Sequence, residues 1–521
     1  MREVHPIKMT LNYTAVTLAL WGLSLSCVGQ TDQTVGLFTN DAESFNGYTL
    51  FAPVSNETTY LIDNCGAKIN SWESAHRAGM MAYLLEDGCI MRSGRTSSKI
   101  FLGGGLGGVI EKFSWSGELI WTFTMANDSV HLHHDIEVLP NGNVLAIAWK
   151  MNSAEDAISK GRDPNKTGLN VWSTLILEIE PLYPQGGHIV WSWDAWDHLV
   201  QDFDTSLPLY GNPRDFPGKI DVNYKAEGGT SYAAKDWLHA NSIDYNPLSN
   251  EIMISVRGFS ELWIIDRESS SDLKYRWGNP RAYGRGMEED QVLFQQHNCH
   301  WIEPGLPGEG QVLIYNNGTN RPEGYYSSVE QVKLPHLVDG EYPISADTPY
   351  GPENPEWRYP EDLNSEFFSQ NVSGAQRLPN GNTLICEGAS GHLFEVNEMG
   401  GLVWDYINPV SIWGALEQTT SAFGNSVFQA HRYAPNYAAF TGRNLTPLGE
   451  IEINPLPSMC EINYAPTCPG DFNHDYVISV QDLIVAISEF GCINCSLDID
   501  GDESFGISDL LILLSAFGTP C

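Results

Sequence analysis

Apolar runs of strand length alternate with turn-forming residues along most of this chain. Four of these runs contain a turn rich in Pro, Gly or Asn: VLPNGNVLAIAW at 138–149, NPLSNEIMISVRG at 246–258, GLPGEGQVLIYNNG at 305–318 and RLPNGNTLICEG at 377–388. The Pro-Asn-Gly-Asn step supplies the positive-φ positions of a tight hairpin. The pattern therefore predicts a series of antiparallel hairpins.

A second recurring segment is a strand that ends in tryptophan. It appears as GGVIEKFSWSGELIWTF at 107–123, LILEIEPLYPQGGHIVWSW at 175–193, LWIIDRESSSDLKYRW at 262–277 and HLFEVNEMGGLVWDY at 392–406. Strand–turn–strand units that recur every several dozen residues, without a long helix, are typical of β-propeller blades. The sequence predicts an all-β propeller with four clear blades and room for two more. Its 49 Gly and 29 Pro suit such a turn-rich protein.

Three polar segments, each with a histidine, interrupt this pattern where a strand should pack a core. They are LHHDIEVLPNGN around His134, LHANSIDYNPLSN around His239 and FQQHNCHWIEP around His297. The innermost strands of a propeller line a central channel, so equivalent positions of successive blades converge there. Alignment of the segments by their turns predicts that these three histidines lie at the same point of three blades.

The doublet at 133–134 offers two candidates for the first of these positions. His134 fits better than His133, because Asp135 then matches Asn298. Three further histidines are interpreted as structural groups bonded to neighbouring backbone: His131, His300 and His392.

Charge narrows the class of partner. The chain has 65 acidic and 28 basic residues and a formal net charge of −37. Nucleic acids and anionic membranes require a basic surface, so we expect neither as a partner. A solvated surface of an exported protein is the simplest interpretation.

The N-terminus has the pattern of a signal peptide. Arg2 and Lys8 precede the apolar run AVTLALWGLSL, which is too short to span a bilayer comfortably, and SCVGQ follows it. Cleavage after Gly29 would remove residues 1–29. Acylation of Cys27 is the weaker alternative, because Leu25 lies one position too close to it. No later segment predicts a membrane span, so we expect a secreted or periplasmic chain in which disulfides can form.

The ordered motifs resemble those of one enzyme family. HHDIEVLPNGN, DWLHANSIDY with ISVRGFSELWIIDR, QHNCHW with VLIYNNG, and QRLPNGNTLICEG with HLFEVN and GLVWDY are similar to segments of the aryl-sulfate sulfotransferases, over residues 48–445. The resemblance implies a six-bladed propeller, at 30–460, that moves a sulfuryl group from a phenolic sulfate ester to a phenolic acceptor without a nucleotide donor. Better-known members dimerise through an N-terminal β-domain for which residues 30–49 are too short, so the oligomeric state is left open.

The resemblance also implies roles for individual residues. His297 would attack sulfur and hold it as an N-sulfonated intermediate, in a ping-pong reaction. His134 and His239, with Arg257 and Asn241, would bind the sulfonate and the phenolic oxygen.

These residue types suit the chemistry. Sulfuryl transfer, like phosphoryl transfer, has a loose transition state that is stabilised mainly by positioning and by cations. Imidazole can act as a nucleophile and as a proton donor near neutral pH, and guanidinium is a fixed, always-charged clamp. Ser373 aligns with the histidine position of the blade at 378–382 and is expected to add a hydroxyl to the same pocket.

Other interpretations stay open. Three histidines are a known zinc set, but Arg257 opposes a cation and Asp135 is the one carboxylate at a matching position. We therefore expect no metal in the channel. The propeller could instead be a non-catalytic binding or adhesion protein, or a hydrolase if water discharges the intermediate.

Residues 468–521 contain two copies of one unit, CPGDFNHDYVISVQDLIVAISEFGC and CSLDIDGDESFGISDLLILLSAFGTPC. Each copy has oxygen donors at positions 1, 3, 5 and 12 of a loop and a backbone carbonyl at position 7, which is the spacing of calcium loops. The predicted calcium ligands are Asp471, Asn473, Asp475, Val477 and Asp482, then Asp498, Asp500, Asp502, Ser504 and Asp509.

In each copy the loop is followed by an apolar helix, and no helix enters the loop. This arrangement resembles dockerin repeats and implies a small α-helical, EF-hand-like calcium module at 466–521. Such a module attaches to a protein partner or to the cell surface, and the sequence leaves open which one.

The cysteines of the tail follow its repeat. Cys468 and Cys495 each lie three residues before the first loop aspartate. Cys492 directly follows the Phe-Gly that ends the first helix, and Cys521 lies three residues after the Phe-Gly that ends the second. We predict the disulfides Cys468–Cys492 and Cys495–Cys521, which would stabilise a module with little core. The pairing of five other cysteines is left open: Cys65, Cys89, Cys299, Cys386 and Cys460.

Overall fold

The computed structural model describes residues 33–517, except 55, 226–234, 270–271, 362–366, 458–459, 461, 463–469, 473–477, 489, 493–498 and 500–503. The predicted signal peptide at 1–29 lies outside the described residues. Within them, no helix combines the length and the apolar character needed to cross a bilayer.

Most of the described strands of the body form six antiparallel sheets. The first three are β29 (Val427–Tyr433), β2 (Tyr48–Pro53), β3 (Thr58–Ile62) and β4 (Lys68–Glu73); β5 (Ala78–Leu84), β6 (Ile90–Arg95), β7 (Gly108–Phe113) and β8 (Leu119–Thr124); and β9 (Val130–Val138), β10 (Val144–Ser153), β11 (Asn170–Pro181) and β12 (Gly187–Asp194).

The other three are β15 (Ala240–Asn246), β16 (Glu251–Val256), β17 (Glu261–Asp266) and β18 (Tyr275–Trp277); β19 (His297–Trp301), β20 (Val312–Asn316), β21 (Ser328–Val332) and β22 (Trp357–Tyr359); and β23 (Gly374–Arg377), β24 (Thr383–Glu387), β25 (His392–Val396), β26 (Leu402–Ile407) and β1 (Gly36–Asn40). We number these six sheets as blades 1 to 6. Short pairs form from β13 (Leu199–Val200) with β14 (Ile220–Asp221), and from β27 (Val410–Ser411) with β28 (Gly414–Ala415).

The first strands of the blades close a ring. In the order β29, β5, β9, β15, β19 and β23, each contacts the next, and β23 contacts β29. The six-bladed β-propeller is therefore confirmed. Helix is scarce in the described body, where α1 (Ala154–Ser159) is one short segment between β10 and β11. Such a ring makes the first strand of each blade the wall of the central channel.

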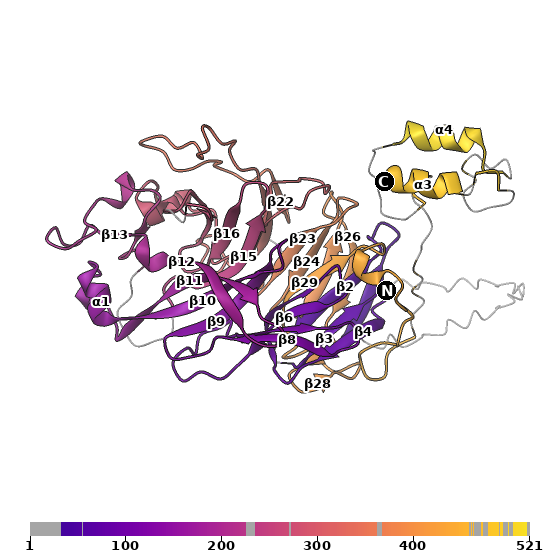
Figure 1. The fold of residues 1–521 in the computed structure, drawn as a ribbon, viewed down its shortest axis with the longest axis horizontal. Coiled ribbons are helices and arrows are strands. Elements are labelled where there is room, and N and C mark those ends of the chain that lie inside the picture. The colour runs from indigo at the N-terminus through magenta and orange to yellow at the C-terminus, as the bar shows by residue number, and fades with distance from the viewer. Residues whose placement is uncertain are drawn as a thin grey trace, which may run out of the picture. The chain divides into compact units, whose positions relative to one another are not determined.

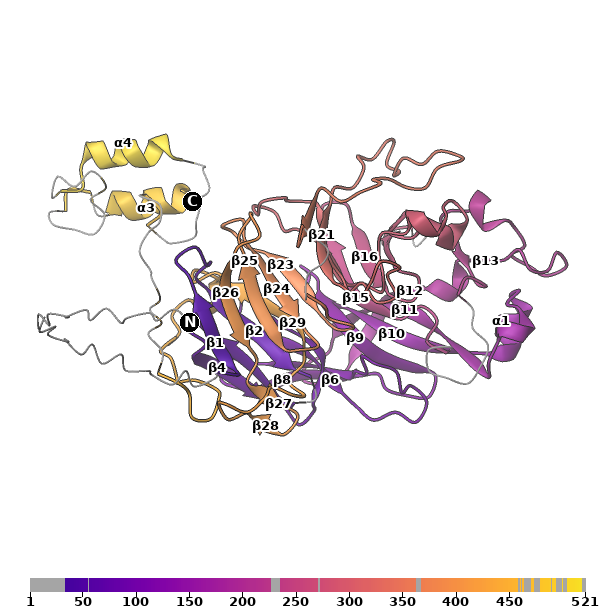
Figure 2. The same cartoon turned by 180° about the vertical axis from the view of Figure 1, so that it is seen from behind.

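Both ends of the propeller chain take part in its closure. β29 pairs with β2 inside blade 1, and β1 pairs with β26 at the edge of blade 6. In Figure 1 and Figure 2 the indigo N-terminal strands lie beside the orange C-terminal strands. A disulfide between Cys65 and Cys460, which are 395 residues apart in sequence, adds a covalent link between these ends.

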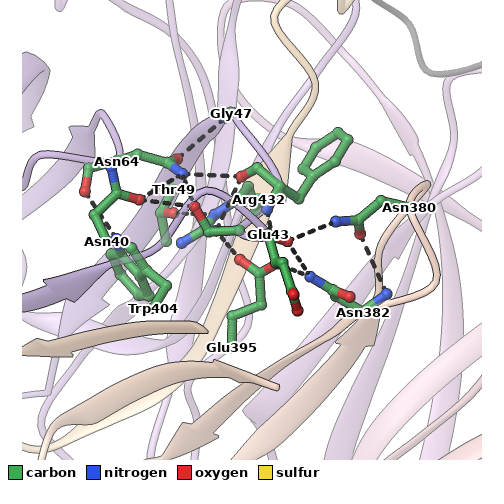
Figure 3. Close-up of polar contacts among 12 residues, drawn as sticks. Asn40, Glu43, Gly47, Thr49, Asn64, Asn380, Asn382, Glu395, Trp404 and Arg432 are labelled. Carbon is green, nitrogen blue, oxygen red and sulfur yellow. Dashed lines mark hydrogen bonds and ion pairs between the residues drawn. The ribbon is translucent and has the colours of Figure 1, made fainter. Parts of the chain in front are cut away.

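A buried ion pair lies at this closure (Figure 3). Arg432 of β29 pairs with Glu395 of β25, and both side chains are fully buried. Arg432 Nε donates to Thr49 Oγ1 at 3.0 Å, and its guanidinium lies 4.2 Å from the ring centroid of Trp404. Glu395 Oε1 also accepts from the Phe45 amide at 2.7 Å. Because a buried charge is costly without such partners, this cluster favours the closed ring over open alternatives.

A similar buried ion pair recurs in other blades. The third strand of blades 2 to 6 each carries a buried glutamate that pairs with an arginine. The pairs are Glu111–Arg92, Glu178–Arg267, Glu261–Arg276, Glu330–Arg358 and Glu395–Arg432. The last Asn of each Leu-Pro-Asn-Gly-Asn turn donates to one of these glutamates, Asn143 to Glu178 and Asn382 to Glu395, both at 2.6 Å. The turn motif is thus tied into its own blade.

His392 in blade 6 gives the fold a pH dependence. Its Nε2 lies 2.7 Å from Asp405 and its Nδ1 lies 3.2 Å from Glu387. Burial lowers the His392 pKa, but the hydrogen bonds to the two carboxylates outweigh burial and raise the pKa to about 9. Because the folded pKa is raised, the stabilisation is complete below the unfolded pKa of about 6.5 and is lost as pH rises through 9.

We therefore expect His392→Gln to lower the free energy of unfolding by about 2 kcal/mol at pH 6 and by much less at pH 10. Urea unfolding of both proteins at the two pH values measures this difference. An equal loss at both pH values would contradict it.

Candidate functional site

His134 and His239 lie next to each other at the channel. His134 lies within β9 at a φ of +53°, and His239 immediately precedes β15 at a φ of +47°. Their ring centroids are 4.8 Å apart. A Cβ at Gly105 would lie 2.0 Å from the His134 ring, so the glycine makes room for the imidazole.

His297 is the first residue of β19, and it approaches the same point. The Phe428 ring of β29 lies 5.9 Å from the His134 ring and 6.2 Å from the His297 ring, centroid to centroid. Arg257 directly follows β16, and its charge acts on both His134 and His297. The structure therefore brings the four predicted residues together. His239 differs from the other two in lying just before its strand rather than in it.

The imidazoles of His134 and His297 are buried and held in the neutral form. His134 is 3% and His297 2% exposed. Burial is the main cause that lowers the pKa of each well below 6.5, and for His297 the Arg257 charge is the next largest. For His134 the neighbouring histidines and Arg257 add to burial. A neutral imidazole keeps a lone pair, which a nucleophile needs.

The imidazole of His297 is hydrogen-bonded to a side-chain amide. Its Nδ1 is 2.7 Å from Asn317 Oδ1. Asn317 Nδ2 in turn donates to the Ser369 carbonyl at 2.8 Å and to Ser373 Oγ at 2.9 Å. Residues 317 and 369–373 thus fix the orientation of the nucleophile candidate.

The imidazole of His239 is hydrogen-bonded to a carboxylate. Its Nδ1 is 2.5 Å from Asp236 Oδ2, and Asp236 Oδ1 accepts from Trp149 Nε1 at 2.9 Å. His133 stacks on the same Trp149 ring, with centroids 4.1 Å apart. Its Nδ1 lies 2.7 Å from Nδ1 of His134. His133 thus contacts both His134 and Trp149, and the choice of His134 as the residue that reaches substrate stays a prediction.

Arg257 is partly buried and lies between neighbouring blades. Its Nη2 donates to Gln295 Oε1 at 2.5 Å, and its backbone amide donates to the His239 carbonyl at 3.3 Å. Gln295 has a φ of +57°, a conformation that non-glycine residues adopt rarely. The contact holds one edge of the guanidinium, whose charge also interacts with the Asp236 carboxylate.

Asn241 and Ser373 are held by hydrogen bonds within the protein. Both are fully buried. Asn241 Nδ2 donates to the Gln296 carbonyl at 2.8 Å, and Ser373 Oγ accepts from Asn317. The predicted contact of either side chain with substrate stays a prediction, whereas their contacts within the protein support the strands that carry the site.

Four residues next to the site were not predicted from the sequence: Asp236, Asn317, Phe428 and Trp149. The signal for Asp236 was its place three residues before His239 in DWLH, and for Asn317 the polar pair that ends VLIYNNG. Phe428 comes from a strand that joins its blade from the opposite end of the chain, so no local pattern indicated it.

The tail contains α3 (Val480–Ser488) and α4 (Ile507–Ser515). The aspartate at position 12 of each loop is fully buried and accepts from the backbone amides at positions 2 and 9. For Asp482 these distances are 2.7 and 2.8 Å, and for Asp509 they are 2.8 and 2.7 Å. The two units thus repeat in structure as they do in sequence.

Of the predicted calcium ligands, Asp471, Asp482, Ser504 and Asp509 are among the described residues, and the other six lie outside them. The described residues alone contain no group of three His, Cys, Asp or Glu arranged for a metal ion. Cys492 is disulfide-bonded, but Cys468, Cys495 and Cys521 lie outside the described residues. The predicted pairs therefore stay predictions.

Comparison with known proteins gives one family. The model of the arylsulfotransferase family matches residues 54–411, which is more than half of the 521-residue chain. No curated protein matches the chain.

Comparison with solved structures gives distant similarities. A protein of unknown function from Bacteroides caccae is 12% identical, with a TM-score of 0.42, over 74% of this chain and 98% of its own. Virginiamycin B lyase from Staphylococcus aureus is 8% identical, with a TM-score of 0.33, over 74% of this chain and 96% of its own. Neither is similar enough to bear on chemistry.

Proposed function

The chain belongs to the arylsulfotransferase family and is an aryl sulfotransferase, and we propose that it works by a ping-pong mechanism in which His297 carries the sulfuryl group. A phenolic sulfate ester is the donor and a phenol is the acceptor. The observation that supports this most is the meeting of three imidazoles and one guanidinium from blades 3, 4 and 5 at one point of the channel.

Each of these groups supplies one requirement of sulfuryl transfer. The His297 lone pair attacks sulfur while the bond from sulfur to the aryl oxygen breaks. Arg257 offers fixed positive donors to the sulfonate oxygens, where charge develops. His134 and His239 lie beside each other, 4.8 Å between centroids, to contact the sulfonate and the departing oxygen. A phenol then takes the sulfuryl group from His297 in the reverse sequence of steps.

The purified protein incubated with 4-nitrophenyl sulfate, with and without phenol, tests this proposal. We expect phenol to stimulate release of 4-nitrophenol and phenyl sulfate to form. Release of inorganic sulfate at the same rate without phenol would show an aryl sulfate hydrolase. No release from a panel of aryl sulfates would favour a non-catalytic propeller.

We also propose that the protein is exported. A disulfide between Cys65 and Cys460 suits an oxidising compartment, secreted or periplasmic. The tail would then act outside the cytoplasm as a calcium-dependent module that binds a protein partner or the cell surface. The repeated capping of both loops by Asp482 and Asp509 supports this proposal.

Calcium should stabilise the tail without taking part in catalysis. Carboxylate and carbonyl oxygens at this spacing suit Ca²⁺, and the channel holds a guanidinium that opposes a cation. We expect two calcium ions per chain by calorimetry. Chelation should expose the tail to a protease while sulfuryl transfer stays within about twofold. If activity fell together with the tail, the two parts would not be independent.

A further inference from the structure

Two of the three imidazoles at the site have hydrogen-bond partners of different charge. His297 Nδ1 faces an amide oxygen of Asn317 at 2.7 Å, and His239 Nδ1 faces a carboxylate oxygen of Asp236 at 2.5 Å. We propose that these partners assign the roles: the neutral Asn317 makes His297 the sulfuryl carrier, and the anionic Asp236 makes His239 the proton carrier. The inference rests on the proposed ping-pong transfer and names two positioning residues for it.

The orientation of the Asn317 amide follows from its surroundings. Its Nδ2 faces the carbonyl oxygens of Ser369 at 2.8 Å and Val372 at 3.3 Å, and carbonyl oxygens only accept. Oδ1 must therefore face His297, and because it also only accepts, Nδ1 of His297 carries the hydrogen. The lone pair of the neutral ring is then on Nε2, and the ring cannot turn to its other tautomer without losing this bond.

Asp236 is fixed just as firmly. It is 7% exposed, and its Oδ1 accepts from Trp149 Nε1 at 2.9 Å, a group that only donates. Its Oδ2 accepts from His239 Nδ1, so the acceptor nitrogen of a neutral His239 ring is Nε2. A carboxylate on Nδ1 stabilises the imidazolium that forms when Nε2 takes a proton, as in catalytic triads. The neutral amide at His297 offers no such compensation.

The steps balance with these assignments. The His297 Nε2 lone pair forms the N–S bond, the S–O bond breaks, and its electron pair leaves on the aryl oxygen. The protonated His239 gives its Nε2 proton to that oxygen and becomes neutral. The acceptor phenol then returns a proton to His239 Nε2, its oxygen bonds to sulfur, and the N–S electron pair returns to His297.

The charge of the partner also sets how reactive the intermediate is. N-sulfonated His297 keeps its Nδ1 hydrogen, so the ring carries positive charge. A carboxylate at residue 317 would stabilise that charge and make the ring a poorer leaving group, whereas the amide leaves the sulfuryl group easy to transfer.

Three variants test the proposal: Asn317→Asp, Asn317→Ala and Asp236→Asn. Rapid quenching and mass spectrometry follow the sulfuryl enzyme made from 4-nitrophenyl sulfate and its discharge by phenol. In Asn317→Asp, a carboxyl oxygen takes the place of Nδ2 and faces the carbonyl oxygens of Ser369 and Val372, which favours the neutral acid at low pH. Relative to the wild type at the same pH, we therefore expect discharge to slow little at pH 6 and roughly tenfold at pH 10, where the carboxylate forms and the intermediate accumulates. With Asn317→Ala we expect slower formation and no longer lifetime, because the acceptor is lost without a new charge.

Asp236→Asn keeps an oxygen for Trp149 but turns an amide donor toward His239 Nδ1, which removes the lone pair from Nε2. Transfer should then fall much further with phenyl sulfate than with 4-nitrophenyl sulfate, because the better leaving group needs less proton donation. Thermal unfolding of each variant shows whether its fold is kept.

A wild-type lifetime in Asn317→Asp at both pH values, or an equally long lifetime in Asn317→Ala, would overturn the assignment of His297. Equal losses on both donors in Asp236→Asn would overturn that of His239. These results differ from failure of the proposed function itself, in which the wild-type protein would form no sulfuryl enzyme.

Discussion

His297→Asn should abolish sulfuryl transfer, with a loss of at least about a thousandfold, because the covalent route is lost together with the ring nitrogen that attacks sulfur. Asparagine is the suitable replacement, since its amide nitrogen can take the place of Nδ1 and donate to Asn317 Oδ1, which is 2.7 Å from Nδ1 in the wild type. The buried acceptor is then not left unpaired, and the fold should persist. Release of 4-nitrophenol in the presence of phenol measures the loss.

His300→Asn is the matched control, because His300 is on the same strand, β19, but lines a cavity, with Glu303 and His431, whose lining includes none of the four site residues. We expect that variant to keep its activity. Quenched wild-type enzyme should show a sulfuryl-sized mass increase on the peptide that contains His297. An increase on a peptide with His134 or His239 instead would contradict the assignment.

Arg257→Lys should lower turnover by about two orders of magnitude, roughly 3 kcal/mol, by analogy with the loss of an oxyanion donor. Lysine keeps the charge but not the planar fork. Arg257 uses one edge for Gln295 Oε1, at 2.5 Å, and we expect the rest of the guanidinium to bind the sulfonate. A single ammonium cannot serve both in this geometry.

The loss in Arg257→Lys should appear mainly in kcat, because charge on the sulfonate oxygens grows in the transition state. Initial rates over a range of donor concentrations separate kcat from KM, and thermal unfolding checks the fold. Turnover within threefold of wild type would mean that Arg257 has only a structural role.

Local patterns predicted most blades because each hairpin carries its own signal. VLPNGN and RLPNGN were expected to be tight turns, and they connect β9 to β10 and β23 to β24. Blade 1 had no such signal, because its first strand, β29, is far from its other strands in the sequence. Val427, where β29 begins, is 365 residues after Ile62, where β3 ends. The buried glutamates of blades 2 to 6 were also missed, because charged residues in apolar strands indicate burial only when their arginine partners are known.

The sequence predicted that four residues of the candidate site converge, but not which groups are hydrogen-bonded to them. His134, His239, His297 and Arg257 do converge, as the alignment of their segments implied. The alignment could not show that His239 lies outside its strand, because a propeller strand can begin before or after the same motif. It could not show the burial of Ser373 either, since neighbouring segments cover that hydroxyl.

The sequence by itself determined the class of fold, the family and the four polar residues at the channel, because all of these depend on spacing along the chain. Only the tertiary structure decided which group is hydrogen-bonded to each imidazole. Asn317 is 20 residues from His297 and is oriented by carbonyls another 52 to 55 residues further on, and Trp149 is 87 residues from Asp236. These partners are set by how blades pack around the ring. Since a hydrogen-bond partner determines the tautomer of an imidazole, the chemistry of each histidine is a property of the closed propeller.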